Sequence, residues 1–455
     1  MSAKKLSKSL IRPIIIFFYK IAFHLLSTKK NIILFESGNA RNYGGNPRYI
    51  YEYLINSEYK DKFTCIWSLE DVSQDIPGNP IKVRRNRLKF LYYSIISNFW
   101  IFDSRHPEYL LKKKKCYYIQ TWHGTPLKKL ALDMDNINMG GRTNIKEYKS
   151  EFVKNSKLWD YLIAQNDFSK KIFKRAFDFK GKFLKIGYPR NDILINKKND
   201  IEVINNIKKK IGLEIDTIKI SDEKNSSKYS EKNTNENSEK NTDKYSKKNT
   251  GKYSENNTDE YSKINIDRCS NKKIILYAPT WRDNEFHSDG KYKFSSEMDY
   301  DLLKNQLSDE YIMIVKYHYL VKDKIDWGKY SDFIIVADEK WDIQELYLIS
   351  DILITDYSSV MFDYSLLKKP ILFYTYDLEF YKDDLRGFYF DLIKEAPGPI
   401  LDTNEDLIEY LKNFNPKNYC NEYGAKYSIF IDKYNQYDDG AASKNIINIL
   451  NNINK

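Results

Sequence analysis

Cysteine is scarce in this sequence, and the few cysteines present are scattered. Cys65, Cys116, Cys269 and Cys420 are the only four in 455 residues. None lies at the short spacing from another that zinc sites and redox motifs use. We therefore expect reduced thiols in a cytoplasmic protein. The chain is long enough to form two or three domains, each with its own core.

A long apolar run is also missing. The most apolar segment, residues 13–26, contains Lys20 and His24, so it is too short and too polar to span a bilayer as a helix. No small-residue cleavage site supports a signal peptide. Because lysines precede this segment, residues 1–30 are expected to form an amphipathic helix on anionic lipid headgroups, or else an ordinary first helix packed on the core. Of the two we favour the membrane helix.

Several kinds of chemical motif are absent as well. No group of acidic residues has the spacing of a metal site, so we predict neither a bound metal nor a cofactor. The loop that contains Gly38, Gly44 and Gly45 matches neither the dinucleotide-binding nor the P-loop spacing, and a plain connection is the better interpretation. The net charge of +11 favours anionic partners such as nucleotides, phosphate polymers or acidic lipids. Nucleic acid is not expected, because the basic residues are spread out and no base-stacking motif is present.

The stretch from Asp351 to Tyr364 is the most informative part of the sequence. Ile352–Ile354 is a short apolar run, as in a strand that is buried on both faces. Polar residues follow, and Ser358 and Ser359 stand where the N-cap of the next helix is expected. In an open α/β sheet, anions bind at such a strand end. A capped turn without a ligand would give the same pattern.

The same order of strand, polar turn and helix recurs along the chain. It begins at residues 31–37 and again at 273–282, and a short strand over Tyr117–Ile119 leads into another polar turn. Alternation of short buried strands with helices is typical of parallel sheets covered by helices. We therefore predict an α/β protein with two such halves, the first of them doubly wound.

One segment differs from the rest in composition. Residues 221–262 repeat variants of Lys-Tyr-Ser-Glu-Lys-Asn-Thr and contain almost no aliphatic side chains, so we expect disorder there. The predicted organisation is a basic amphipathic segment (1–30), an N-terminal lobe (31–190), a connection (191–220), the low-complexity insert (221–262), a C-terminal lobe (271–430) and a C-terminal helix (431–455).

Polar residues that follow strands are the candidates for chemistry. His123 stands at a strand end next to Gly124, which suits a general base, although a histidine that orders its own turn would look the same. Arg190, in the predicted crossover between the lobes, could hold a phosphate with two hydrogen bonds or form a surface salt bridge. Further candidates at strand ends are Thr280, Arg282, Lys316 and His318.

Five motifs together carry more weight than any one of them. They are Trp122-His-Gly-Thr-Pro126, Gly187-Tyr-Pro-Arg190, Ala278-Pro-Thr-Trp-Arg282, Lys316-Tyr-His318 and Thr355-Asp-Tyr-Ser-Ser-Val-Met-Phe-Asp363. In this order they resemble the CDP-glycerol glycerophosphotransferase family, the teichoic-acid primases and polymerases. The resemblance covers most of residues 31–430 apart from the insert. It implies a GT-B-like fold: two Rossmann-like, doubly wound lobes with a cleft between them.

The resemblance also implies an activity. Glycerol phosphate, or a related polyol phosphate, would pass from a CDP-activated donor to a hydroxyl, with release of CMP. His123 matches the family's proposed general base, and His318 matches a second histidine near the donor pyrophosphate; both are predicted to be catalytic. Asp363 is expected to orient the site, since its charge would repel phosphate. The predicted substrate-binding residues are Trp122, Gly124, Thr125, Pro126, Arg190, Pro279, Thr280, Arg282, Lys316, Ser358, Ser359 and Asp363.

The implied partners are a CDP-glycerol or CDP-ribitol donor, a lipid-linked or polymer acceptor of teichoic-acid or capsule synthesis, and an anionic membrane surface. A peripheral place on the cytoplasmic face of the membrane follows, and a homo-oligomer is compatible with it. The region before the first strand is shorter than in many family polymerases. The enzyme is therefore expected either to add a single unit or to polymerise. The alternatives are a GT-B glycosyltransferase that uses a nucleotide sugar and a basic membrane- or nucleic-acid-binding module without activity.

Overall fold

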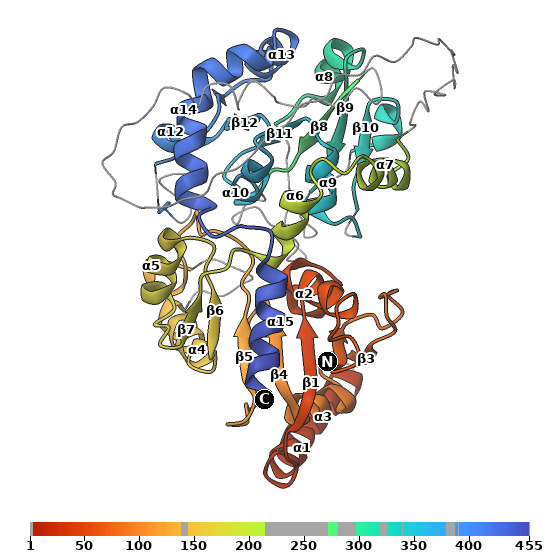
Figure 1. Ribbon diagram of the computed structural model, residues 1–455, viewed down its shortest axis with the longest axis vertical. Coiled ribbons are helices and arrows are strands. Elements are labelled where there is room, and N and C mark those ends of the chain that lie inside the picture. Colours follow the sequence, from red (N-terminus) through yellow and green to blue (C-terminus); the bar gives the residue numbers. More distant parts are fainter. Residues whose placement is uncertain are drawn as a thin grey trace, which may run out of the picture.

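The computed structural model describes residues 3–137, 144–213, 272–280, 297–317, 325–338, 340–378, 387–389 and 391–454. The insert expected at 221–262 lies outside these residues. The described residues form two lobes, which lie one above the other in Figure 1.

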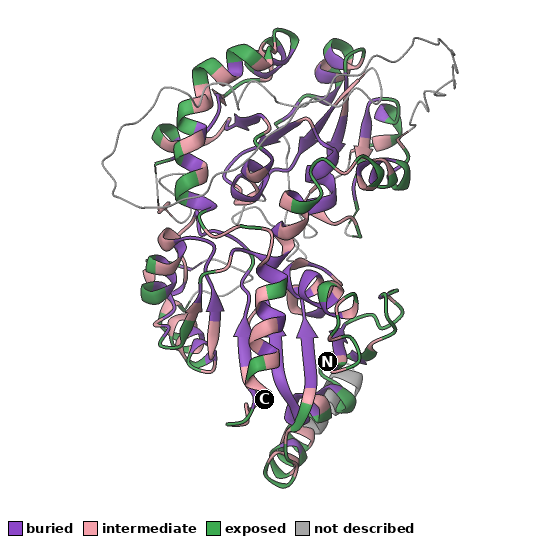
Figure 2. Ribbon diagram, in the orientation of Figure 1, coloured by how far each residue is buried: buried purple, intermediate pink, exposed green. Residues whose placement is uncertain are grey.

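The N-terminal lobe is built on a seven-stranded parallel sheet with the order β3-β2-β1-β4-β5-β6-β7. Its strands are β1 (Lys29–Glu36), β2 (Thr64–Leu69), β3 (Ile81–Arg84), β4 (Ser97–Phe102), β5 (Tyr117–Gln120), β6 (Tyr161–Ile163) and β7 (Lys182–Leu184). Its helices are α1 (Ala3–Leu25), α2 (Gly45–Ile55), α3 (Leu88–Ile96), α4 (Ile145–Ser156) and α5 (Asp167–Ala176). The central strand β4 is buried along its whole length, because helices cover both faces of the sheet (Figure 2).

The C-terminal lobe repeats this plan with six parallel strands in the order β10-β9-β8-β11-β12-β13. They are β8 (Lys273–Tyr277), β9 (Tyr311–Val315), β10 (Ile334–Val336), β11 (Ile352–Thr355), β12 (Ile371–Tyr374) and β13 (Ile400–Leu401). The helices that follow the connecting helix α6 (Asp192–Asn196) are α7 (Ile201–Lys210), α8 (Tyr300–Leu307), α9 (Ile343–Ile349), α10 (Val360–Tyr364), α12 (Leu392–Glu395), α13 (Asn404–Lys412) and α14 (Pro416–Tyr434).

Each sheet reverses its strand order once, between β1 and β4 in the first lobe and between β8 and β11 in the second. In open parallel sheets, ligands bind beyond the carboxyl ends of the strands at this reversal. The topology therefore gives each lobe one place for a ligand before any side chain is considered.

Helix α1 only partly joins the core. Its Tyr19 is buried, and the Tyr19 hydroxyl accepts a hydrogen bond from the Leu111 backbone N–H at 3.0 Å. In contrast, Ile14, Phe17 and Phe18 are each more than half exposed. The helix thus packs on the lobe along one side and leaves an apolar side uncovered. No helix in the described ranges is long and apolar enough to cross a membrane.

The chain crosses between the lobes a second time near its end. After α14 it returns to the N-terminal lobe as α15 (Ala442–Ile453), which lies against α2 and buries Ile446, Ile447 and Leu450 (Figure 1). The C-terminal helix predicted within 431–455 corresponds to α15, and the first residues of that range end α14 on the other lobe.

Asp438 holds this second crossing in place. Its carboxylate accepts hydrogen bonds from the Tyr188 backbone N–H (3.0 Å), Asn191 Nδ2 (3.2 Å) and Gln165 Nε2 (2.7 Å). Dehydration by the surrounding protein nevertheless raises the pKa of Asp438 to about 7. Ionisation of this carboxyl therefore opposes folding around neutral pH.

We predict that Asp438 makes the free energy of unfolding fall as the pH rises from about 4 to about 7. The unfolded chain loses this proton near the ordinary carboxyl pKa, whereas the folded chain keeps it to a higher pH. The stabilising contribution is complete below the unfolded pKa and is lost as the pH rises through the folded one. Urea unfolding at a series of pH values measures it. Asp438→Asn should flatten this part of the profile, and the neighbouring Asp439→Asn should not; equal slopes in both variants would contradict the assignment.

Candidate functional site

A cavity of about 360 Å³ lies between the two lobes, and we call it the interlobe cavity. Its walls come from the turns after β1, β4 and β5 on one side and after β8, β9 and β11 on the other, so it lies at the strand-order reversal of both sheets. The lining residues considered below are Ser37, Gly38, Arg48, Asp103, His123, Arg190, Pro279, Lys316 and Ser358.

His123 follows β5 and is held in one orientation. Its Nδ1 lies 3.0 Å from the backbone carbonyl oxygen of Asp103, and its ring stacks on Trp122 with the ring centres 4.4 Å apart. Because a carbonyl only accepts, Nδ1 must carry the proton, which leaves the lone pair on Nε2. Loss of hydration in the cavity, together with the charge of Arg190, lowers the pKa of His123, although part of the residue remains exposed. Near neutral pH the ring is therefore uncharged and can accept a proton.

Trp122 supports this orientation at a cost in backbone strain. It has a φ of 55°, in the left-handed region that a bulky residue seldom adopts. Its indole is buried, with ring centres 4.6 Å from Phe177 and 5.7 Å from Phe173. The aromatic packing holds the strained turn from which the His123 ring faces the cavity.

Asp103, at the end of β4, organises the N-terminal wall. Its carboxylate accepts hydrogen bonds from Ser37 Oγ (2.6 Å) and the Gly38 N–H (2.9 Å), while its carbonyl orients His123. Gly45 completes the contact: it has a φ of 59°, and a Cβ there would lie 2.9 Å from the Asp103 carboxylate. Asp103 was not among the predicted residues. Its only sequence signal is its position directly after the apolar strand.

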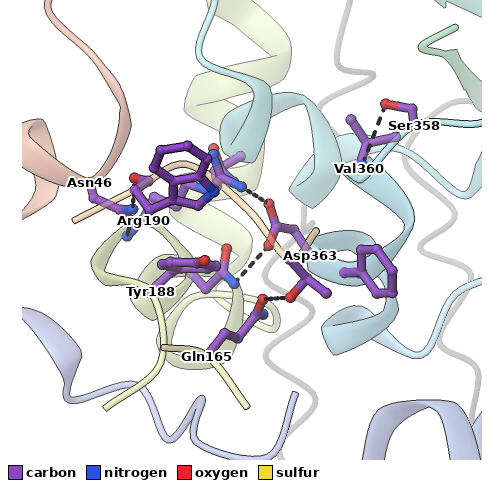
Figure 3. A network of polar contacts seen from close by, with 12 residues as sticks. Asn46, Gln165, Tyr188, Arg190, Ser358, Val360 and Asp363 are labelled. Atoms are coloured by element: carbon purple, nitrogen blue, oxygen red, sulfur yellow. Dashed lines mark hydrogen bonds and ion pairs between the residues drawn. The ribbon is translucent and has the colours of Figure 1, made fainter. Parts of the chain in front are cut away.

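Arg190, which lines the cavity, and Asp363 join the two lobes, and Figure 3 shows their contact. The Arg190 guanidinium forms an ion pair with Asp363, and Asn191 Nδ2 donates to the same carboxylate at 3.0 Å. On the other side, the Arg190 backbone N–H donates to Asn46 Oδ1 at 3.1 Å, and Asn46 Nδ2 donates to the Trp122 carbonyl at 2.9 Å. Asp363 thus orients Arg190, and Asn46 ties Arg190 to the turn that carries His123.

Gly124 lets the two walls approach each other closely. A Cβ at this position would lie 3.2 Å from Ser359 Oγ and 3.5 Å from Arg190 Nη2. Its φ of 150° also disfavours a side chain. Glycine here keeps the turn of His123 directly against the turn that follows β11.

Arg48 forms a second bridge at the edge of the cavity. From α2 it makes ion pairs with Asp342 and Glu345 of the other lobe, each at 3.1 Å, and with Glu52 of its own helix at 2.7 Å. Sequence reasoning missed it, since its partners are nearly 300 positions away, at sequence separations of 294 and 297.

The predicted site residues divide into groups. His123, Arg190, Pro279, Lys316 and Ser358 line the interlobe cavity. Trp122, Gly124, Thr125, Pro126, Thr280, Ser359 and Asp363 do not line it and form or support its walls. Arg282 and His318 lie outside the described residues.

The supporting residues have identifiable partners. Thr125 Oγ1 donates to Gln165 Oε1 at 2.6 Å, and the Thr280 N–H donates to the Asp356 carboxylate at 2.7 Å. Among the residues that do line the cavity, Lys316 Nζ donates to the Asp338 carbonyl. No group of three or more His, Cys, Asp or Glu in the described ranges could hold a metal ion. That no metal is needed stays a prediction.

Comparison with known proteins agrees with the resemblance. The family model for CDP-glycerol:poly(glycerophosphate) glycerophosphotransferase matches residues 17–220 and 226–452. The chain is 40% identical to the teichoic acid poly(glycerol phosphate) polymerase of Bacillus spizizenii, over 99% of this chain and 100% of that protein. It is 37% identical to the teichoic acid glycerol-phosphate transferase of Staphylococcus aureus, over 96% and 98%. It spans 50% of the corresponding Bacillus subtilis polymerase, at 38% identity.

The structure resembles that of the wall teichoic acid polymerase TagF, with a TM-score of 0.79 and 34% identity over 100% of this chain and 98% of that chain. This likeness confirms the predicted GT-B-like fold of two Rossmann-like lobes. The matches to the family model and to full-length relatives show that the chain is an enzyme and belongs to the CDP-glycerol:poly(glycerophosphate) glycerophosphotransferase family.

Proposed function

We propose that this chain transfers glycerol phosphate from CDP-glycerol to a hydroxyl of a teichoic-acid acceptor and releases CMP. The observation that carries the proposal is the uncharged His123 in the cavity between two Rossmann-like lobes, with its Nε2 able to accept a proton. Family membership supplies the donor class. The cavity supplies a base on one wall and the cation Lys316 on the other.

The reaction requires one proton transfer and one displacement at phosphorus. The acceptor hydroxyl attacks the donor phosphorus that bears the glycerol, and its proton passes to His123 Nε2. The bond from this phosphorus to the oxygen bridging to CMP breaks, and CMP leaves with that oxygen. A positioned base contributes about 10²–10⁴-fold to such a step.

Charge that develops on the leaving group needs fixed donors. Lys316 and Ser358 line the C-terminal wall, and Arg190 approaches from between the lobes. Because Asp363 already balances the charge of Arg190, this guanidinium is suited to position an oxygen more than to add net positive charge. Arg282 and His318 are expected near the pyrophosphate on the strength of the resemblance.

The acceptor is proposed to be lipid-linked, at the cytoplasmic face of the membrane. Support comes from α1, which exposes Ile14, Phe17, Phe18 and Leu25 although apolar side chains of this size are normally covered. A helix of this kind suits an interface between water and lipid.

A CDP-ribitol donor is the nearest alternative, since the poly(ribitol-phosphate) polymerase of Bacillus spizizenii is 27% identical over 90% of this chain. A glycosyltransferase that uses a nucleotide sugar is the alternative on fold alone. Mass spectrometry of products formed from CDP-glycerol, CDP-ribitol or UDP-sugars separates the three.

Replacing the base is expected to lower turnover strongly and leave donor binding intact. His123→Ala should lower kcat by about 10²–10⁴-fold. Release of CMP from CDP-glycerol in the presence of acceptor measures this. In the wild type, kcat/KM should decline as the pH falls through the lowered pKa of His123, because the protonated ring cannot accept a proton.

The matched control is His24→Ala, which removes an exposed histidine of α1 outside the cavity and should leave kcat unchanged. His318→Ala is expected to lower activity as well. Near-wild-type turnover in His123→Ala would remove this residue from the role of base.

The two serines after β11 are expected to differ. Ser358 lines the cavity, whereas Ser359 faces Gly124, so Ser358→Ala should weaken CDP-glycerol binding more than Ser359→Ala does. Loss of one hydrogen bond corresponds to roughly a two- to tenfold increase in Kd. Calorimetry in the His123→Ala background prevents turnover, and thermal unfolding checks the fold. Unchanged affinity in both variants would leave this turn with a structural role only.

A further inference from the structure

A second pocket, of about 540 Å³, lies on the N-terminal lobe and shares no lining residue with the interlobe cavity. We call it the arginine pocket, because Arg12 of α1, Arg85 after β3 and Arg105 after β4 line it together with His106. The mechanism above uses none of these residues. Guanidinium groups drawn from three separate elements are typical of a site that recognises phosphate.

Two of these arginines are poised to take an anion. The Arg105 guanidinium lies over the rings of Phe152 (4.8 Å) and Tyr148 (5.2 Å), and that of Arg12 lies 5.8 Å from the ring centre of Tyr109. Stacking covers the face of a guanidinium and leaves its N–H groups to donate in the plane. Neither arginine forms an ion pair within the described ranges.

Acidic residues in and beside the pocket limit how much negative charge a ligand can carry. Arg85 is bound to buried Glu36 at 3.1 Å, so its charge is already balanced, and Glu108 and Glu151 also line the pocket. With acidic groups on its walls, the pocket suits a singly charged phosphodiester better than a pyrophosphate.

His106 supplies a separate observation. It is 4% exposed, and its Nδ1 is buried without a hydrogen-bond partner in the structure. Burial lowers the pKa of His106 to about 4, so the ring is neutral and one nitrogen carries a hydrogen. Buried polar atoms are rarely left unpaired, so the unpaired nitrogen of this lining residue marks the pocket as a place where a polar partner is missing.

The pocket adjoins the site of the reaction. Arg105 lies two residues after Asp103, whose carbonyl orients His123, and Asn39 of the pocket adjoins Gly38 of the interlobe cavity. An acceptor whose terminal hydroxyl reaches His123 therefore has a place for the rest of its chain along this edge of the lobe.

We infer that the arginine pocket binds a phosphodiester of the acceptor, behind the hydroxyl that attacks the donor. This inference rests on the proposed function and deepens it: the enzyme would favour an acceptor that already carries a phosphodiester. The ligand chemistry is shared with anionic lipid headgroups, so the test must distinguish the two sources.

The test compares two soluble probes, bis(glyceryl) phosphate and diglycerol, which carry the same terminal alcohol with and without a phosphodiester. Calorimetry should show tighter binding of the phosphodiester to the wild type. In the Arg12→Gln/Arg105→Gln double variant its Kd should rise at least about tenfold, as expected for lost charge-assisted hydrogen bonds. The CDP-glycerol Kd should stay at the wild-type value. The matched control, Arg87→Gln, removes an exposed arginine that lines neither pocket and should leave both Kd values unchanged.

Equal phosphodiester affinity in the wild type and the double variant would overturn the inference. So would a double variant that loses only its binding to phosphatidylglycerol vesicles, because the pocket would then recognise a lipid headgroup. Binding of the phosphodiester through these arginines, without any CMP release by the wild type from CDP-glycerol, would support the pocket while contradicting the proposed transfer. Since Arg105 packs on aromatic rings, Arg12→Gln alone, with thermal unfolding, guards against a folding defect.

Discussion

The buried ion pair between Arg190 and Asp363 is the contact on which the geometry of the cleft depends. The two residues come from opposite lobes, and the Asp363 side chain is only 2% exposed. A charge buried this far must be paired, and removing one partner of such a pair typically costs about 3–5 kcal/mol. The pair therefore fixes one relative position of the lobes near His123, and Arg48 adds a second constraint at the edge of the cavity.

Arg190 is connected to the turn of His123 by hydrogen bonds between neutral groups. Asn46 accepts from the Arg190 backbone and donates to the Trp122 carbonyl, so one amide side chain ties the Arg190 turn to the His123 turn within the N-terminal wall. The histidine itself is oriented by a carbonyl and not by a carboxylate. Burial lowers the pKa of the ring, and this effect outweighs the charge of the nearby Asp103 carboxylate and the bond to its carbonyl, both of which raise it.

Local sequence patterns were enough to predict the strand ends but not the contacts between them. His123, Arg190, Lys316 and Ser358 follow strands or crossovers and could be found one motif at a time. Asp103, Asn46 and Arg48 could not, because their roles come from partners distant in sequence. The same holds for the fold: the long buried strands were recognisable, whereas β6, of three residues, depends on tertiary packing that overrides local propensity.

The predicted binding residues that do not line the cavity show why a motif is more than a set of contacts. Trp122 and Gly124 belong to the same turn as His123 but act differently. Aromatic packing around Trp122 holds the strained backbone of the turn, and Gly124, which has no side chain, lets the opposite wall come close. A base displaced by about 1 Å loses much of its effect, so the role proposed for His123 depends on both residues. Around this cavity, the residues that hold His123 in place therefore matter to the site as much as the histidine itself.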